Sequence, residues 1–322
     1  MLLLLGLLSF FQFHGGRISG HDPEAAAGGE LPSRASGNAA LIERLRRTTL
    51  LNGDETLGQL RLEGHDAPVG QADASPSRGR GGFLTPNPFE PPYRESYTSL
   101  AALRYPLPDN TQSYELDESK ATFLFYGQEP VLQWYSSLRS NTEVCAVRFV
   151  DSDRVDYRLR TFPDRESALR EDYVITHRHH CGTCSSLRDL AIYLAKPDLT
   201  TPTRTCSRNL TAGGIKACLM EEVGFGEHCA ETWAYNVLHT RHHCAATCIE
   251  YYGLWNVLTN NMSEAHTDER GNLNPCLACD EYTSGPGFQY AAGRTRRTSG
   301  LTSAIHRPMA EIFPVDHRRY FE

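Results

Sequence analysis

Cysteines and histidines are the residues of this chain whose types and spacing could carry chemistry. Two segments, from Thr176 to Cys184 and from His239 to Cys248, share the pattern Arg-His-His-Cys followed by a second cysteine three or four positions later. Neutral imidazoles and thiolates are preferred ligands of zinc and copper. If the fold brought the two segments together, a zinc or copper site could form. Its candidate ligands are His179, His180, His242 and His243.

Solvent-facing histidines beside structural disulfides are the alternative interpretation of these segments. Adjacent side chains on a strand or a helix point in different directions, so neighbouring histidines do not readily bind one ion. The sequences flanking the two segments also differ. On this interpretation the protein has no cofactor.

The segment Cys181-Gly-Thr-Cys184 follows a predicted strand and begins a predicted helix. It resembles the active-site turn of thioredoxin-like oxidoreductases, in which the helix dipole favours the thiolate of the first cysteine. The resemblance implies that Cys181 would attack and Cys184 would resolve the mixed disulfide. Pro202, however, lies only 18 residues after Cys184, too close for the cis-proline of that fold. Eight other cysteines also offer these thiols permanent partners.

All ten cysteines lie in one stretch of the chain, and an even number of them predicts a disulfide framework of undetermined connectivity. The expected members are Cys145, Cys181, Cys184, Cys206, Cys218, Cys229, Cys244, Cys248, Cys276 and Cys279. Zinc binding by the two Cys-x-x-Cys segments is the alternative. Their separation, 92 residues from Cys184 to Cys276, is far from compact zinc-ribbon spacing.

An oxidising compartment agrees with three features of the sequence. The apolar run from Met1 to Phe13 has the length of a signal-peptide core, although no basic residue precedes Arg17. Asn209 and Asn261 begin Asn-x-Ser/Thr sequons, which are acceptors of N-linked glycans. The third feature is the even set of ten cysteines, because the disulfides that it predicts persist in secreted and luminal proteins. We therefore expect a secreted or luminal glycoprotein, with no membrane span in the mature chain because no later segment reaches 18 apolar residues.

Composition divides the chain into three parts. Residues 1–20 are expected to form the signal peptide, 21–92 a disordered leader or pro-segment rich in glycine and proline, and 93–322 a cysteine-rich domain. Within the leader, residues Ala39 to Leu51 could form a short amphipathic helix. A plastid transit peptide is an alternative for this leader, although its acidic residues are unusual for one. Arg-x-Arg-Arg, at residues 44–47 and 294–297, resembles a furin-type processing site.

The fold expected for the domain is α+β, with a small mixed sheet followed by a disulfide-stapled helical region. Strands are predicted at 122–126, 144–150, 155–162 and 173–176, and the turn Asp151–Arg154 joins the middle two. Helices are predicted at 97–104, 131–138, 165–171, 186–195, 214–223, 227–238 and 241–258. The remainder, from Thr259 to Glu322, is expected to be rich in loops.

Charge argues against a nucleic-acid partner, because 32 basic residues stand against 39 acidic ones and give a net charge of -7. Only three of the basic residues are lysines. Arg294, Arg296 and Arg297 could bind an anion, although an exposed loop explains such a cluster as well. Hydrolase and phosphate-binding motifs such as Gly-x-Ser-x-Gly and the P-loop do not occur in the sequence.

Three segments carry a resemblance to a group of cysteine-rich secretory-pathway proteins of algae. They run from His180 to Tyr193, from Pro197 to Thr200 and from Ala292 to Leu301. The resemblance implies the compartment and the disulfides, and it implies no catalytic residue. The sequence thus favours a secreted or luminal binding or structural protein, without catalytic chemistry of its own, for an extracellular or luminal partner. The alternatives are a thiol-disulfide oxidoreductase and a zinc- or copper-binding protein.

Overall fold

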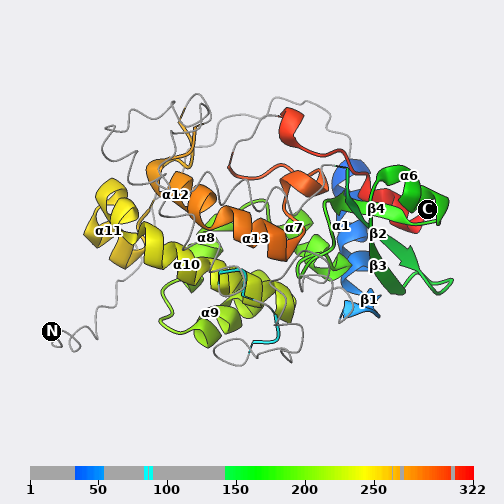
Figure 1. Ribbon diagram of the computed structural model, residues 1–322, viewed down its shortest axis with the longest axis horizontal. Coiled ribbons are helices and arrows are strands. Elements are labelled where there is room, and N and C mark those ends of the chain that lie inside the picture. Colours follow the sequence, from blue (N-terminus) through cyan, green and yellow to red (C-terminus); the bar gives the residue numbers. More distant parts are fainter. Residues whose placement is uncertain are drawn as a thin grey trace, which may run out of the picture.

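A computed structural model of the chain describes residues 33–53, 83–85, 87–89, 142–262, 264–268, 272–305 and 309–322. Among these residues, a four-stranded sheet lies at one end of the molecule and a larger helical part at the other (Figure 1). The predicted α+β class, with a small mixed sheet and a disulfide-stapled helical region, is confirmed. The expected signal peptide, the helices at 97–104 and 131–138, and the strand at 122–126 lie outside the described residues.

The sheet has the strand order β1-β3-β2-β4. Its strands are β1 (Thr49–Leu50), β2 (Val144–Phe149), β3 (Asp156–Phe162) and β4 (Val174–Arg178), with α6 (Arg165–Arg170) between the last two. The predictions for β2, β3, β4 and α6 are confirmed. β2 pairs antiparallel with β3 and β4, whereas β1 pairs parallel with β3. Asp151 closes the predicted turn, because its carboxylate accepts hydrogen bonds from the amides of Val155 and Asp156.

Both faces of β2 are buried, and the two-residue period of a strand divides its side chains between two cores. Cys145 and Val147 pack with Leu187 and Leu190 of α7 (Leu187–Ala195). Val144 and Ala146 instead join the core on the α6 side of the sheet. The central strand therefore carries packing on both faces, with helices α7 and α6 on opposite sides.

Two segments that precede residue 93 also belong to the described fold. Helix α1 (Ser33–Arg46) packs against α7 and buries Leu41 and Leu45 in the core beside β2 and β3. A second segment, at residues 83–85, places Phe83 in the core of the helical part. Parts of the chain that the sequence assigns to a leader thus contribute to the core beside β2 and β3 and to the core of the helical part.

The helical part begins with α7, which Ser186 caps: its hydroxyl accepts the amide hydrogen bond of Asp189. It continues through α8 (Thr200–Cys206) and α9 (Ala212–Cys218), which ends in a π-helical turn from Leu219 to Val223. Gly224, at φ +94°, ends this helix in the left-handed conformation that favours glycine.

A single helix, α10 (Glu227–Tyr252), stands where the sequence predicts two. The predicted break after Leu238 is wrong, because His239 and Thr240 stay helical and their side chains contact Ser284. The break occurs instead at Gly253, whose φ of +85° separates α10 from α11 (Leu254–Thr259). Tertiary contacts thus outweigh the weak helix propensity of two polar residues.

The expectation of loops after Thr259 is wrong for residues 275–292, which form α12 (Pro275–Thr283) and α13 (Gly285–Ala292). Asn274 caps α12 by accepting the amide hydrogen bond of Leu277, and Pro275 occupies its first position. Two disulfides join α12 to α10. Within the described ranges, no helix has both the length and the apolar character needed to cross a membrane.

The packing of α1 predicts a difference between two leucines six residues apart. Leu45 is 0% exposed and Leu51 is 47% exposed. Replacement of Leu45 by alanine should lower the free energy of unfolding by about 2 to 5 kcal/mol, because it leaves a cavity. The matched control Leu51→Ala should change it by no more than about 0.5 kcal/mol. Urea unfolding with intact disulfides measures both values, and equal values would contradict the docking of α1.

Candidate functional site

Every cysteine of the chain is in a disulfide, and none is free. The five pairs are Cys145–Cys181, Cys184–Cys229, Cys206–Cys218, Cys244–Cys279 and Cys248–Cys276. Cys181 and Cys184 are therefore not bonded to each other: the first is joined to β2 and the second to α10. Both are 0% exposed, so this geometry offers neither a dithiol nor an accessible attacking sulfur.

The segment from Cys181 to Cys184, hereafter the cysteine loop, lies against the end of α13. The amides of Thr183 and Cys184 donate to the carbonyls of Ala291 and Ala292 at 2.9 and 3.0 Å. A Cβ atom on Gly182 would lie 2.5 Å from the carbonyl oxygen of Ala291, so only glycine allows this approach. The glycine of the predicted redox motif thus serves backbone packing.

Arg294 joins the cysteine loop to the sheet from within the core. This side chain is 0% exposed and donates five hydrogen bonds, all to neutral oxygens. Three go to the carbonyls of Thr176, Cys184 and Ser185, and two to the hydroxyls of Thr176 and Ser299. The expectation of an anion-binding or exposed Arg294 is therefore wrong, and its burial also places one end of the second Arg-x-Arg-Arg motif inside the protein.

A serine–histidine pair lies next to this arginine. His177 Nε2 is 2.7 Å from Ser185 Oγ, within the reach of a nucleophile and its general base. Burial, followed by the charge of Arg294, lowers the pKa of His177 well below its ordinary value. Both side chains are 0% exposed, and Ser185 Oγ also accepts the amide hydrogen bond of Gly182. With no access for a substrate, the pair stabilises the cysteine loop.

The four histidines proposed as metal ligands do not form one site. His180 Nε2 contacts the carbonyl oxygen of Tyr290 at 2.7 Å, and its Nδ1 lies 3.6 Å from Glu143. His242 and His243 are exposed on α10. In the part of the chain that the structure covers, no group of three or more histidine, cysteine, aspartate or glutamate side chains could hold a metal ion. The geometry therefore does not support the zinc or copper interpretation.

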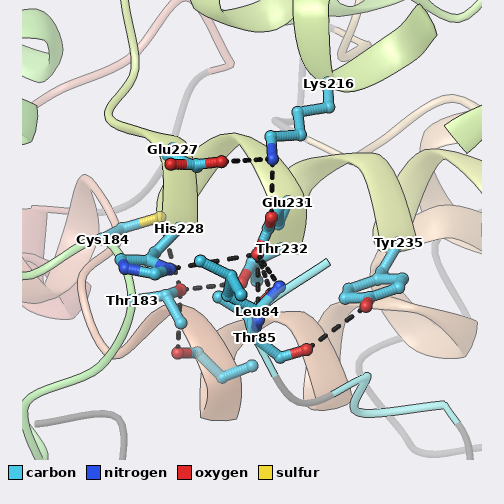
Figure 2. A network of polar contacts seen from close by, with 11 residues as sticks. Leu84, Thr85, Thr183, Cys184, Lys216, Glu227, His228, Glu231, Thr232 and Tyr235 are labelled. Atoms are coloured by element: carbon cyan, nitrogen blue, oxygen red, sulfur yellow. Dashed lines mark hydrogen bonds and ion pairs between the residues drawn. The ribbon is translucent and has the colours of Figure 1, made fainter. Parts of the chain in front are cut away.

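A buried carboxylate on α10 holds Leu84 and Thr85 in place (Figure 2). Glu231 is 0% exposed; its Oε2 accepts hydrogen bonds from the amides of Leu84 and Thr85, and its Oε1 pairs with Lys216 at 2.7 Å. Burial alone raises the pKa of Glu231, but three polar neighbours outweigh burial and lower that pKa to about 2. In order of effect these are His228, Lys216 and Thr85.

An aromatic cavity of about 150 Å³ lies in the helical part, open to solvent. Its walls include Tyr193 of α7, Trp233 of α10 and Phe288 of α13, together with Leu199 and Ile305. Leu199, Phe288 and Ile305 are apolar. This volume is close to that of an engineered apolar cavity known to bind benzene in another protein.

Two polar atoms on residues that line this cavity, Tyr193 Oη and Trp233 Nε1, are closed off from solvent and have no hydrogen-bond partner among the described residues. Each such atom costs about 1 to 3 kcal/mol in a folded protein. Burial raises the pKa of Tyr193. The neighbouring indole of Trp233 favours the ionised form and opposes part of that rise. The hydroxyl is therefore protonated and able to donate.

Arg296 also lines the cavity and is held in place by the backbone. Its Nε donates to the carbonyl of Thr302, and its Nη1 donates to the carbonyls of Tyr193 and Lys196. A guanidinium has five N–H groups. The two on Nη2 have no protein acceptor among the described residues. Arg296 thus adds a cation to the mainly apolar lining of the cavity.

Sequence reasoning did not bring these cavity residues together, since they come from four segments between Tyr193 and Ile305. Arg296 alone was singled out, as part of the arginine cluster. The two sequons differ in the structure: Asn261 is exposed, whereas Asn209 is half-buried and donates to the carbonyl of Cys206.

Residues 212–315 match a family model whose description is a family of unknown function, DUF8771. The matched segment covers α9 to α13 together with Arg294 and Arg296, and it leaves the sheet and the cysteine loop outside. No curated protein and no solved structure matches the chain.

Burial of Arg294 predicts a large loss of stability on its replacement. Arg294→Met leaves three buried carbonyl oxygens without their donors, so the free energy of unfolding should fall by at least about 3 kcal/mol. Arg170, whose side chain is 69% exposed, provides a control: Arg170→Met should have an effect within about 0.5 kcal/mol. Urea unfolding of the oxidised proteins measures both. A loss for Arg294→Met no larger than for the control would refute the bridging role.

The lowered pKa of Glu231 predicts an acid-dependent contribution to stability. Because its pKa is about 2 in the folded protein against 4.5 as the reference, the stabilisation is complete above pH 4.5 and disappears as the pH falls towards 2. The full stabilisation from the lowered pKa of Glu231 is roughly 3 kcal/mol. The difference in unfolding free energy between wild type and Glu231→Gln should therefore shrink across this window. Glu227→Gln, at the partly exposed partner of the same lysine, is the control, and a difference independent of pH would contradict the assignment.

Proposed function

We propose that this is a secreted or luminal protein that acts by binding an extracellular or luminal partner on a rigid disulfide-stabilised scaffold, without catalytic chemistry of its own. The observation that carries the proposal is the oxidation of all ten cysteines into five disulfides. Bridges of this kind contribute about 2 to 4 kcal/mol each, mainly by restricting the unfolded chain. They persist where the surroundings are oxidising.

Two further features support a binding role over a catalytic one. The groups that resemble catalytic machinery, namely the cysteine loop and the pair His177–Ser185, are buried and hydrogen-bonded to each other or to the backbone. In contrast, the aromatic cavity is open to solvent and is lined by apolar and aromatic side chains together with Arg296. Binding by a preformed, mostly apolar cavity with a few polar groups is the usual arrangement of small-molecule sites.

The compartment is part of the proposal. The apolar start of the sequence and the exposed sequon at Asn261 support entry into a secretory pathway and glycosylation. The resemblance to cysteine-rich secretory-pathway proteins of algae supports the same compartment. Secretion from a eukaryotic host would agree with this compartment. Endoglycosidase should lower the mass of the secreted wild type and leave the mass of Asn261→Gln unchanged. Retention in the cytosol in reduced form would contradict it.

The disulfide framework predicts the outcome of thiol chemistry on the secreted protein. Alkylation in denaturant should find about zero free thiols before reduction. Mass spectrometry should recover the linked peptides Cys145–Cys181 and Cys184–Cys229. A readily reduced Cys181–Cys184 bridge would favour the oxidoreductase alternative. Stoichiometric zinc or copper that is lost on replacement of His179, His180, His242 and His243 would favour the metal-binding alternative.

A further inference from the structure

Helix α11 exposes an apolar face that no part of the described structure covers. Leu254, Trp255 and Leu258 are 56%, 71% and 58% exposed, and Tyr251, just before them at the end of α10, is 40% exposed. No side chain of α11 is buried. The helix lies at the end of the described structure farthest from the sheet (Figure 1). Because exposed apolar patches mark interaction sites or cause aggregation, we expect a partner for this face.

The sequence around α11 carries no charge. Asp, Glu, Lys and Arg are absent from Tyr251 to Ser263, although charged residues make up 22% of the chain. A charged partner would find no complementary group in this stretch. The apolar face therefore suits an uncharged partner that itself has an apolar surface.

The chain turns back on α11 directly after the helix ends. Asn260 has a left-handed backbone, with φ +58°, and the amide of Asn261 donates to the carbonyl of Asn256 at 2.9 Å. The amide of Asn260 donates to the carbonyl of Val257 at 3.3 Å. These two bonds define a Schellman motif, in which the side chain at the position of Asn261 commonly lies over those five and six residues earlier. Here those residues are Asn256 and Trp255.

The backbone on both sides of Asn261 is held in place. Asn260 Nδ2 donates to the hydroxyl of Thr205 at 3.3 Å, and Arg204 donates to the carbonyl of Met262 at 3.2 Å. Asn261 itself is exposed and begins an Asn-x-Ser sequon. Glycosylation joins its Nδ2, which loses one proton, to the anomeric carbon of a sugar, and the polyprenyl pyrophosphate of the oligosaccharide donor leaves. The glycan therefore starts from a fixed point beside the apolar face of α11.

We propose that the N-linked glycan on Asn261 covers this apolar face, with its first sugars packed against Trp255. The C–H groups on one side of a pyranose ring form an apolar surface, which is complementary to the face of an indole ring. The core sugars are uncharged, and their hydroxyl groups stay in contact with water. This inference rests on the proposed secretory route. It assigns the glycan a function, namely to protect α11 from self-association and from other apolar surfaces.

The test uses the full-length protein secreted from a eukaryotic host and follows the fluorescence of Trp255. That signal is the difference between proteins with and without Trp255→Phe, measured both in the wild type and in Asn261→Gln. The glycan should lower the quenching of Trp255 by acrylamide about twofold, because it covers one face of an exposed ring. Equal quenching, on a wild type whose mass confirms glycosylation, overturns this inference alone. A wild type without a glycan overturns the proposed secretory route as well.

Binding of an anilinonaphthalenesulfonate dye measures the uncovered apolar face. Asn261→Gln should bind at least about twofold more dye than the glycosylated wild type. Addition of Trp255→Ser to this variant should remove the increase. The control is Leu169→Ser, at a leucine that is 52% exposed on α6, and it should leave the increase unchanged. An increase that persists in the variant with Trp255→Ser contradicts the proposal.

Two other occupants of this face have signatures of their own. A dimer of the glycosylated wild type in sedimentation, lost in Trp255→Ser, would identify a second copy of the chain. Binding of the glycosylated wild type to phosphatidylcholine vesicles, lost in the same variant, would identify a membrane surface. Either result overturns the assignment of this face to the glycan.

Discussion

The buried guanidinium of Arg294 is the interaction on which the rest of the structure depends. Its five hydrogen bonds gather oxygens from β4, from the cysteine loop and from Ser299 near the C-terminal end of the fold. Burial disfavours this cation and lowers the pKa of Arg294, and a set of correctly oriented neutral dipoles compensates. Those oxygens must stay in place, so the sheet and the helical part are fixed to each other through one side chain. The cysteine loop completes this junction with two disulfides, one to β2 and one to α10.

The same junction shows why residue types alone do not identify a catalytic site. Cys181, Cys184, His177 and Ser185 have the identities and short separations that redox or nucleophilic catalysis requires, and His177 even contacts Ser185. Catalysis also requires access for a substrate and a reactive group that is not already bonded. These side chains are buried, and their polar atoms bond within the protein. The cavity has the opposite character: its residues form no motif, yet they surround a space that is open to solvent. Access to solvent therefore indicates a candidate binding site more directly than a sequence motif does.

Local patterns predicted much of the fold. The strand predicted at 155–162 and the helix predicted at 186–195 are present as β3 and α7, because the side chains of β3 alternate in burial and Ser186 caps α7. Long-range effects were not predictable from the same rules. Polar His239 and Thr240 continue α10 because α12 packs beside them, and α12 itself is stabilised by disulfides to α10 that no local signal reveals. The burial of Arg294 was not predicted, since four of its five acceptor atoms belong to residues more than a hundred positions away. The cavity was missed for the same reason.

Cys181 and Cys184 each bond to a distant partner rather than to each other, and this has a consequence for how the chain matures. Thiols three positions apart meet far more often than thiols 36 or 45 positions apart, the separations of the native pairs. Oxidation of the nascent chain therefore first favours a bridge within the cysteine loop, which must be undone by thiol–disulfide exchange. Native pairing has to wait until β2 and α10 have reached the loop. Maturation of this protein is thus expected to depend on a disulfide isomerase, whose supply would limit the yield of correctly paired protein.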